Sequence, residues 1–484
     1  MRARRADGPD GRAAAEHADR IGGVDGNDGI DRADGIDCAD GIDCADGADH
    51  MNAATAADDA DRADRADRAD RAVEAVFRIE SVKIIAAVAR IVRDIGIAEE
   101  IAQDALVAAL ERWPESGVPE KPGAWLMATA KHRAIDLVRR RETYARKLAE
   151  VGRTLEDVPA PDSAGIEAAE ADTIDDDLLR LIFTACHPVL STEARIALTL
   201  RLLGGLTTDE IARAFLAPEA TVAQRIVRAK RSLARAGVPF EVPYGAERAE
   251  RLSSVLEVVY LIFNEGYSAT AGDDLLRPGL CEDALRLARV LSGLMDGEPE
   301  AHALAALLEL QASRTAARTG PDGEPVLLAD QNRSRWNQLL IHRGFAALTR
   351  AGALGGPPGP YALQAAVAAY HARAATYEET DWAAIAALYA QLAALRPSPV
   401  VELNRAVAVS MAEGPAAGLA LVDALADEPA LKTYHLLPSV RGDLLHRLGR
   451  TDEARAEFVR AAGLTRNERE RALLRERADR IGQS

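Results

Sequence analysis

The sequence predicts an all-α protein built from several helical domains. The chain of 484 residues is rich in Ala, Leu, Arg and Glu, 48% of its residues are apolar, and aromatic residues make up only 4%. This composition suits amphipathic helices that pack through small side chains, and the length is sufficient for two to four domains. Apolar residues recur at helical spacing from Ala72 onward, so we expect almost no β-sheet.

Shifts in composition and periodicity divide the chain into parts. We expect a disordered acidic tail at 1–71, a helical domain at 72–145, a linker at 146–174, a second helical domain at 175–238, a third at 246–350 and helical repeats at 360–484.

The first 71 residues are of low complexity. DGIDCADGIDCADG repeats a heptapeptide and DRADRADRADRA a tripeptide, and nineteen acidic against ten basic residues give this tail −9 of the chain's net charge of −17. Such a segment has too few apolar residues to form a core, and we predict that it is disordered. It lacks the Asp spacing with a following Glu that calcium loops require. Met51 leaves a second possible translation start.

An acidic helix face is the first notable feature of the domain at 72–145. In the helix around DIGIAEEIAQDALVAALERW the apolar residues share one face, while Glu100, Gln103 and Asp104 lie on another. We expect a short turn with Trp113, Pro114 and Pro119 to follow this helix.

The next helix opens at Pro122 and ends in a run of basic residues. Between Lys131 and Lys147 there are seven basic residues and two acidic ones, with Trp125 upstream. An aromatic residue beside clustered cations is typical of sites that hold single-stranded bases and their phosphates. The candidate residues are Trp125, Lys131, His132, Arg133, Arg139, Arg140 and Arg141.

The domain at 175–238 contains a predicted helix-turn-helix, LTTDEIARAFLAPEATVAQRIVRAKRSLARAG. Thr207 and Glu210 form a capping box at the first helix, and Pro218 stands where the second helix should begin. The second helix has an apolar stripe, and five basic residues but no acidic one lie between its Gln224 and Arg235. This local charge opposes that of the whole chain and indicates a DNA-reading face. Its candidate residues are Gln224, Arg225, Arg228, Lys230 and Arg231.

The order of these motifs resembles the extracytoplasmic-function (ECF) sigma factors of the sigma-70 family. IAEEIAQDALVAALERW is similar to region 2.2, AWLMATAKHRAIDLVRRR to regions 2.3 and 2.4, and LTTDEIARAFLAPEATVAQRIVRAKRSL to region 4.2. The resemblance implies a promoter-directing subunit of RNA polymerase that has no catalytic activity or cofactor. It also implies that Glu100, Gln103 and Asp104 dock on the β′ clamp helices, with the β subunit as a further partner.

The same resemblance assigns roles to the basic residues. Those around Lys131, His132 and Arg133 would capture a base of the minus-ten element, and Arg139 to Arg141 would contact phosphates. In the helix-turn-helix, Gln224, Arg225 and Arg228 would lie near base edges of the minus-thirty-five element, and Lys230 and Arg231 on phosphates. His132 stands where members often carry Asn, and Ala223 where they often carry a polar residue.

The C-terminal half extends beyond a minimal sigma factor. The segment VRGDLLHRLGRTDEARAEFVRAA matches the tetratricopeptide pattern. Two predicted helix pairs upstream of it have a comparable period. The whole order resembles the sigma subgroup with a fused repeat extension, which implies that the extension contacts and regulates the sigma domains. A polar and aromatic set could line a pocket, although buried polar ties between helices are the favoured interpretation. Its members are Asn264, Glu265, Tyr267, Asp330, Arg333, Arg335 and Trp336.

Other functions have weaker support. Cys186 and His187 lack a third ligand or an orienting acid, so we expect neither a metal site nor a catalytic nucleophile. No apolar run is long enough to span a bilayer and no signal peptide is visible, so we expect a cytoplasmic protein without membrane contact. A stand-alone helix-turn-helix regulator with a repeat sensor is the alternative, but it has no use for the acidic face of Glu100, Gln103 and Asp104.

Overall fold

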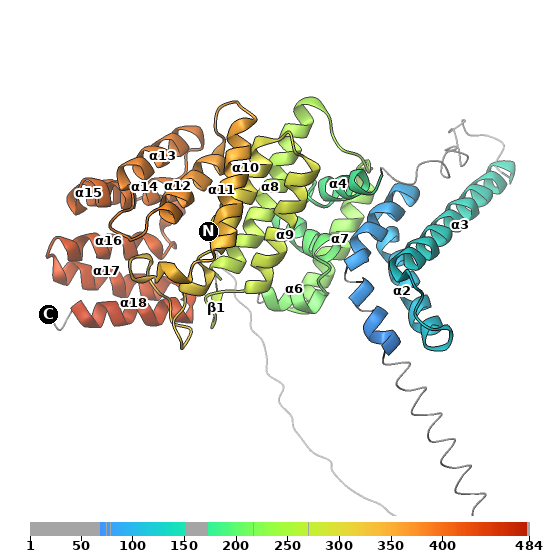
Figure 1. Cartoon of the computed structure of the whole chain (residues 1–484), viewed down its shortest axis with the longest axis horizontal. Helices are drawn as coiled ribbons and strands as arrows, with labels where there is room; N and C mark the ends of the chain where they lie inside the picture. Colours follow the sequence, from blue (N-terminus) through green and yellow to red (C-terminus); the bar gives the residue numbers. More distant parts are fainter. Residues whose placement is uncertain are drawn as a thin grey trace, which may run out of the picture. The chain divides into compact units, whose positions relative to one another are not determined.

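The computed structural model describes residues 68–73, 75–77, 79–151, 173–215, 217–269 and 271–481, which belong to one compact unit. The structure is 76% helical, which confirms the all-α class (Figure 1). Most of the predicted acidic tail lies outside the described residues, including Met51 and the Asp-rich repeats that were compared with calcium loops. Linker residues 152–172 also lie outside them. No helix of the described ranges combines the length and apolar character that crossing a bilayer requires.

The N-terminal block consists of three helical stretches. Described residues from 68 to 92 are helical, so residues 68–71, assigned to the acidic tail, belong to this stretch. It is followed by α2 (Ile95–Ser116) and α3 (Pro122–Val151). Asp94 caps α2 by accepting hydrogen bonds from the backbone N–H groups of Gly96 and Ile97. Helix α3 begins at Pro122 as predicted and continues into the range assigned to the linker.

The turn expected at Trp113, Pro114 and Pro119 is correct only for Pro119, because α2 continues through Trp113 and Pro114 to Ser116. Trp113 is fully buried and meets Trp125 of α3 edge to face, with ring centroids 5.6 Å apart. This contact holds the last turn of α2 against α3 despite the N–H that Pro114 lacks. The helix ends at Gly117, whose φ of 81° lies in the region that favours glycine.

The helix-turn-helix block forms as predicted. Its elements are α4 (Thr173–Ala185), α5 (Thr192–Thr199), the π-helix η2 (Leu200–Gly204), α6 (Thr208–Ala214) and α7 (Glu219–Arg235). Thr207 and Glu210 make both hydrogen bonds of the capping box at α6. Helix α7 follows directly after Pro218, and its apolar stripe of Val222, Ile226, Ala229 and Leu233 is buried.

The middle of the chain is organised around one helix whose central ten residues are all buried. The helices here are α8 (Gly245–Tyr267), α9 (Pro278–Leu294), α10 (Pro299–Ala312) and α11 (Gln338–Ala353), with 3₁₀ turns η3 (Thr315–Ala317), η4 (Leu328–Asp330) and η5 (Arg333–Arg335). All ten residues from Ala301 to Leu310 of α10 are buried. Helices α8, α9, α11 and α12 surround it (Figure 1).

The C-terminal part is a row of helices that pack on their neighbours in sequence. They are α12 (Pro360–Arg373), α13 (Trp382–Leu395), α14 (Pro399–Ala412), α15 (Pro415–Asp423), η6 (Pro429–Leu431), α16 (Leu436–Arg447), α17 (Thr451–Leu464) and α18 (Glu468–Ile481). Gly442 of α16 lies against the fully buried ring of Phe458 in α17, where a Cβ atom would come within 3.3 Å of the ring. Both positions belong to the predicted tetratricopeptide pattern, and a repeat solenoid stays a prediction.

The described residues contain one sheet of two short parallel strands. Strand β1 (Ala271–Gly272) pairs with β2 (Arg466–Asn467), so Ala271 lies opposite Arg466. The expectation of almost no sheet therefore holds. The pairing nevertheless joins the end of the chain to the loop after α8.

Candidate nucleic-acid interface

The outer face of α7 presents basic side chains to solvent. Gln224, Arg228 and Arg231 are exposed and Arg225 is half-buried, while the opposite stripe fills the core. The sequence has no acidic residue between 220 and 235. An exposed basic helix face on a helix-turn-helix matches the shape and charge of a DNA major groove.

Lys230 points away from this outer face, toward α2. Its Nζ pairs with the carboxylate of Glu99, and its side chain is only 21% exposed. The same carboxylate accepts a hydrogen bond from Arg201 Nε of η2 at 2.7 Å, and Glu99 is itself buried. We call Glu99, Arg201 and Lys230 the ionic junction. While it is formed, Lys230 is engaged with a carboxylate and cannot neutralise a DNA phosphate.

Sequence reasoning missed Glu99, although it selected the adjacent Glu100. The position carried one signal: Ile95 and Ala102, one turn away on either side, are both on the buried side of α2. A carboxylate on a buried helix face requires a partner. The partners could not be identified, because Arg201 lies 102 residues further along the chain.

The basic end of α3 is open to solvent. His132, Arg139, Arg140 and Arg141 are exposed, and Lys131 and Arg133 are half-buried. Trp125 is also half-buried, because its ring packs on Trp113. This packing leaves part of the Trp125 ring surface accessible for stacking.

The acidic face of α2 lies beside the basic face of α3. Glu100 and Asp104 are exposed, and Asp104 Oδ2 lies 3.7 Å from Arg133 Nη1 in a loose, solvated ion pair. Gln103 Nε2 donates to Glu99 Oε1 at 3.4 Å. The residues predicted to bind polymerase and minus-ten DNA are thus neighbours on adjacent helices.

Two exposed apolar residues of α2 extend this surface. Val107 and Leu110 are 51% and 39% exposed, and both line a cavity of about 1170 Å³ that Arg201 and Arg277 also border. The sequence analysis assigned no role to Val107 or Leu110. Exposed apolar residues beside a polar face are typical of a protein-binding surface.

The Cys186 and His187 pair is structural in character. Burial raises the pKa of Cys186 to about 11, so its thiol stays protonated at neutral pH, and its Sγ lies 3.3 Å from Thr199 Oγ1. Burial also lowers the pKa of His187, whose Nδ1 accepts a hydrogen bond from the backbone N–H of Val189. Within the described ranges no three His, Cys, Asp or Glu side chains converge to hold a metal.

The polar set between Asn264 and Trp336 is distributed among several contacts. Arg277 pairs with Glu265, and the guanidinium of Arg318 lies 3.7 Å from the ring centroid of Tyr267. Trp336 is buried, with Arg314 and Arg333 against its ring. Of the remaining predicted members, Asn264 is half-buried, and Asp330 and Arg335 are exposed. The set therefore ties neighbouring elements together at several separate places.

Helices α8 and α9 form a continuous core with the helix-turn-helix block. Arg251 Nη2 donates to the carbonyl of Phe183 at 3.0 Å, and Ser254 Oγ donates to the carbonyl of Cys186 at 2.6 Å. Arg286 Nη2 donates to the carbonyl of Leu203 at 2.9 Å. We call this contact the core junction. Its arginines satisfy backbone carbonyls near the ends of α4 and η2.

Comparison with known proteins assigns the parts of this architecture. Residues 79–144 match the model "Sigma-70 region 2", residues 180–233 match "Sigma-70, region 4", and residues 251–352 match "Family of unknown function (DUF6596)". An uncharacterized protein of Rhizobium meliloti (strain 1021) is 44% identical over 395 residues, which cover 82% of this chain and 92% of that protein. ECF RNA polymerase sigma factor SigK of Mycobacterium sp. (strain KMS) is 29% identical over 143 residues, which cover 29% of this chain and 69% of that protein.

The helix-turn-helix with its exposed basic helix, preceded by a matched region 2 domain, defines a DNA-binding protein of transcription initiation. The chain belongs to the ECF-type sigma factors of the sigma-70 family, in a form with a long C-terminal extension. The resemblance drawn from the sequence is thereby confirmed. From here the N-terminal block is called region 2, the helix-turn-helix block region 4, and residues 245–481 the extension.

Proposed function

We propose that the protein docks on core RNA polymerase through the face of α2 that carries Glu100, Gln103 and Asp104, with the β′ clamp helices as the partner. Region 4 would lie near the β subunit. The observation that carries this proposal is that an acidic face on α2 and a basic face on α7 are both open to solvent within matched region 2 and region 4 domains. The protein would act in the cytoplasm as an initiation factor with no catalysis of its own.

The two basic faces would read two promoter elements. In region 4, Gln224, Arg225 and Arg228 would approach base edges of the minus-thirty-five element, and Arg231 its phosphates. Lys230 would join the phosphate contacts once it has left Glu99. In region 2 the minus-ten residues would be Trp125, Lys131, His132, Arg133, Arg139, Arg140 and Arg141.

We further propose that the extension biases the sigma domains between a closed state and a polymerase-competent state. The ionic junction, which joins region 2 to region 4, supports the existence of two states, because Lys230 cannot bind Glu99 and a DNA phosphate together. The core junction supports the role of the extension, because α8 and α9 share a core with region 4. A truncation near Gly237 would remove part of the core of region 4. Point variants therefore test the change between the two states better than truncation does.

Promoter-directed transcription by core polymerase, with and without this protein, tests the function. Glu100→Lys combined with Asp104→Lys reverses the charge of the docking face, and we expect it to abolish stimulation while the fold is kept, because both side chains are exposed. Glu115→Lys, an exposed acid near the far end of α2, is the matched control. Absence of both stimulation and polymerase binding in the unaltered protein would instead support a stand-alone helix-turn-helix regulator.

A further inference from the structure

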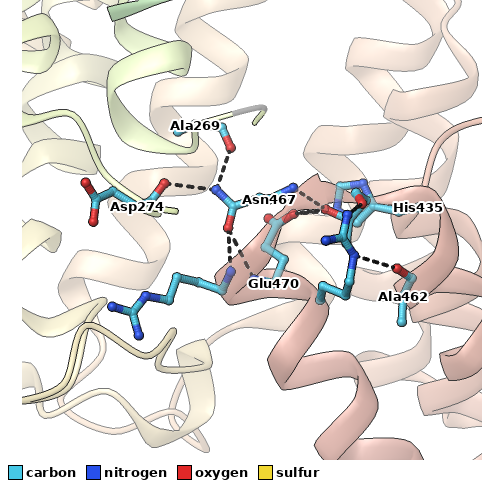
Figure 2. Close-up of polar contacts among 9 residues, drawn as sticks. Ala269, Asp274, His435, Ala462, Asn467 and Glu470 are labelled. Atoms are coloured by element: carbon cyan, nitrogen blue, oxygen red, sulfur yellow. Dashed lines mark hydrogen bonds and ion pairs between the residues drawn. The ribbon is translucent and has the colours of Figure 1, made fainter. Parts of the chain in front are cut away.

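A buried asparagine joins the last helix of the chain to the middle of the extension. Asn467 is completely buried at the start of α18. Its Oδ1 accepts hydrogen bonds from the backbone N–H groups of Arg469 at 3.0 Å and Glu470 at 3.2 Å, which caps α18. Its Nδ2 donates to the carbonyls of Ala269 at 3.1 Å and Asp274 at 2.9 Å (Figure 2). One side chain therefore orders both a helix end and a loop almost 200 residues away.

Other contacts fix the same segment to the C-terminal helices. Glu470 accepts a hydrogen bond from Thr465 Oγ1 at 2.8 Å and lies 3.1 Å from His435 Nε2 next to α16 (Figure 2). Arg471 donates to the carbonyls of Thr465 and Ala462, at the end of α17. Segment 465–471 is thus tied to α17 and to the start of α16 by side-chain contacts.

The loop that Asn467 holds is connected at its far end to the helix-turn-helix. Arg277 closes the loop, and its Nη2 donates to the carbonyl of Ala271 at 2.8 Å. Its Nη1 donates to the carbonyl of Ala214, the last residue of α6, and pairs with Glu265. Ala271 itself lies in the strand that pairs with Arg466. The loop therefore lies between the C-terminal segment and the first helix of the helix-turn-helix.

We propose that the loop of residues 269 and 271–277 couples the C-terminal helices to the helix-turn-helix, with Asn467 and Arg277 as positioning residues at its two ends. A protein partner that displaces α16 to α18 would pull segment 465–470 from the loop and loosen the hold of Arg277 on α6. This inference rests on the proposed regulation by the extension and supplies its route to DNA reading. This series of hydrogen bonds joins α18 to α6 through one short loop. A displacement at either end of the loop should therefore alter the contacts at the other end.

Hydrogen–deuterium exchange on the full-length protein tests the coupling. Asn467→Asp keeps the capping oxygen of α18 but removes the donor to Ala269 and Asp274. We expect the amides that close α6, those of Phe215 and Ala217, to exchange about fivefold faster. Asn337→Asp is the matched control, because Asn337 caps α11 through the oxygen that Asp retains, and it should leave α6 unchanged. Unaltered exchange at α6 in Asn467→Asp would overturn the coupling.

The reverse experiment starts from Arg277 and does not disturb α18 directly. Arg277→Lys keeps the charge beside Glu265, but a lysine cannot also reach the carbonyls of Ala214 and Ala271. If the two ends are coupled, the backbone amides of Arg469 and Glu470 should exchange faster in this variant. Effects confined to α6 would refute it. Exchange is measured without polymerase or DNA, so the two proposals fail separately. If the extension does not regulate transcription, the exchange experiment can still show that the two ends of the loop are coupled. If the extension does regulate transcription, the exchange experiment can still show that they are not.

Discussion

Region 4 is contacted by α2 and by α8 in two different ways. Helix α2 meets it through charge, with Glu99 between Arg201 and Lys230. Helix α8 meets it through buried donors to backbone carbonyls, from Arg251 to Phe183 and from Ser254 to Cys186, and the apolar core around both contacts is continuous. Arg201 and Lys230 are 23% and 21% exposed, so their pairs with Glu99 are open to competing anions, whereas the Arg251 side chain, only 4% exposed, is not. The ionic junction is thus suited to open during function, and the core junction to persist.

Breaking the core junction should have the largest effect. Arg251→Ala removes a side chain that is 4% exposed and leaves the carbonyl of Phe183 without its partner. We expect the free energy of unfolding to fall by about 3 kcal/mol, measured by urea denaturation. Arg248→Ala, one turn earlier, loses a partly exposed pair with Glu298 and should cost less than about 1 kcal/mol. Equal losses in the two variants would show that the core junction is no more than a surface contact.

Acid should weaken the extension through a buried histidine. Burial, with Arg314 and Arg333 nearby, lowers the pKa of His371 to about 4 from its ordinary value of 6.5. Near pH 6 His371 therefore binds a proton in the unfolded chain but not in the folded chain. The folded state keeps its full stability above the pKa of the unfolded chain and loses it as the pH falls toward the pKa of the folded chain. The loss between pH 7 and pH 5 should be roughly 2 kcal/mol.

The contribution of His371 can be isolated with a matched pair of variants. Urea denaturation at both pH values should show a smaller loss in His371→Gln than in the unaltered protein. His342→Gln, at an exposed position of α11, should keep the full loss. A pH dependence that is identical in all three proteins would assign the acid sensitivity to other groups.

Local signals in the sequence predicted the helices of region 2 and region 4, but not the contacts between these helices. The capping box of Thr207 and Glu210 and the buried stripe of α7 follow from residues within a few positions of each other. Tertiary packing overrode the local signal at Pro114, because the Trp113 ring holds the helix against α3. Glu99 and Asn467 were missed because their partners lie about 100 and 200 residues away, and no periodicity encodes which helices meet.

The ionic junction should respond to a substitution that keeps the size and shape of one side chain. Glu99→Gln keeps the shape of the side chain but removes the charge that holds Lys230, so Lys230 becomes free for phosphate. We expect the free protein to bind a minus-thirty-five DNA duplex about fivefold more tightly at low salt, measured by fluorescence anisotropy. The gain should shrink as salt rises, because salt weakens the attraction between Lys230 and a DNA phosphate. Glu100→Gln removes the same charge from the next, exposed position and should leave the affinity unchanged. If both variants gain alike, the net charge of α2 governs DNA binding, and the ionic junction is not a gate.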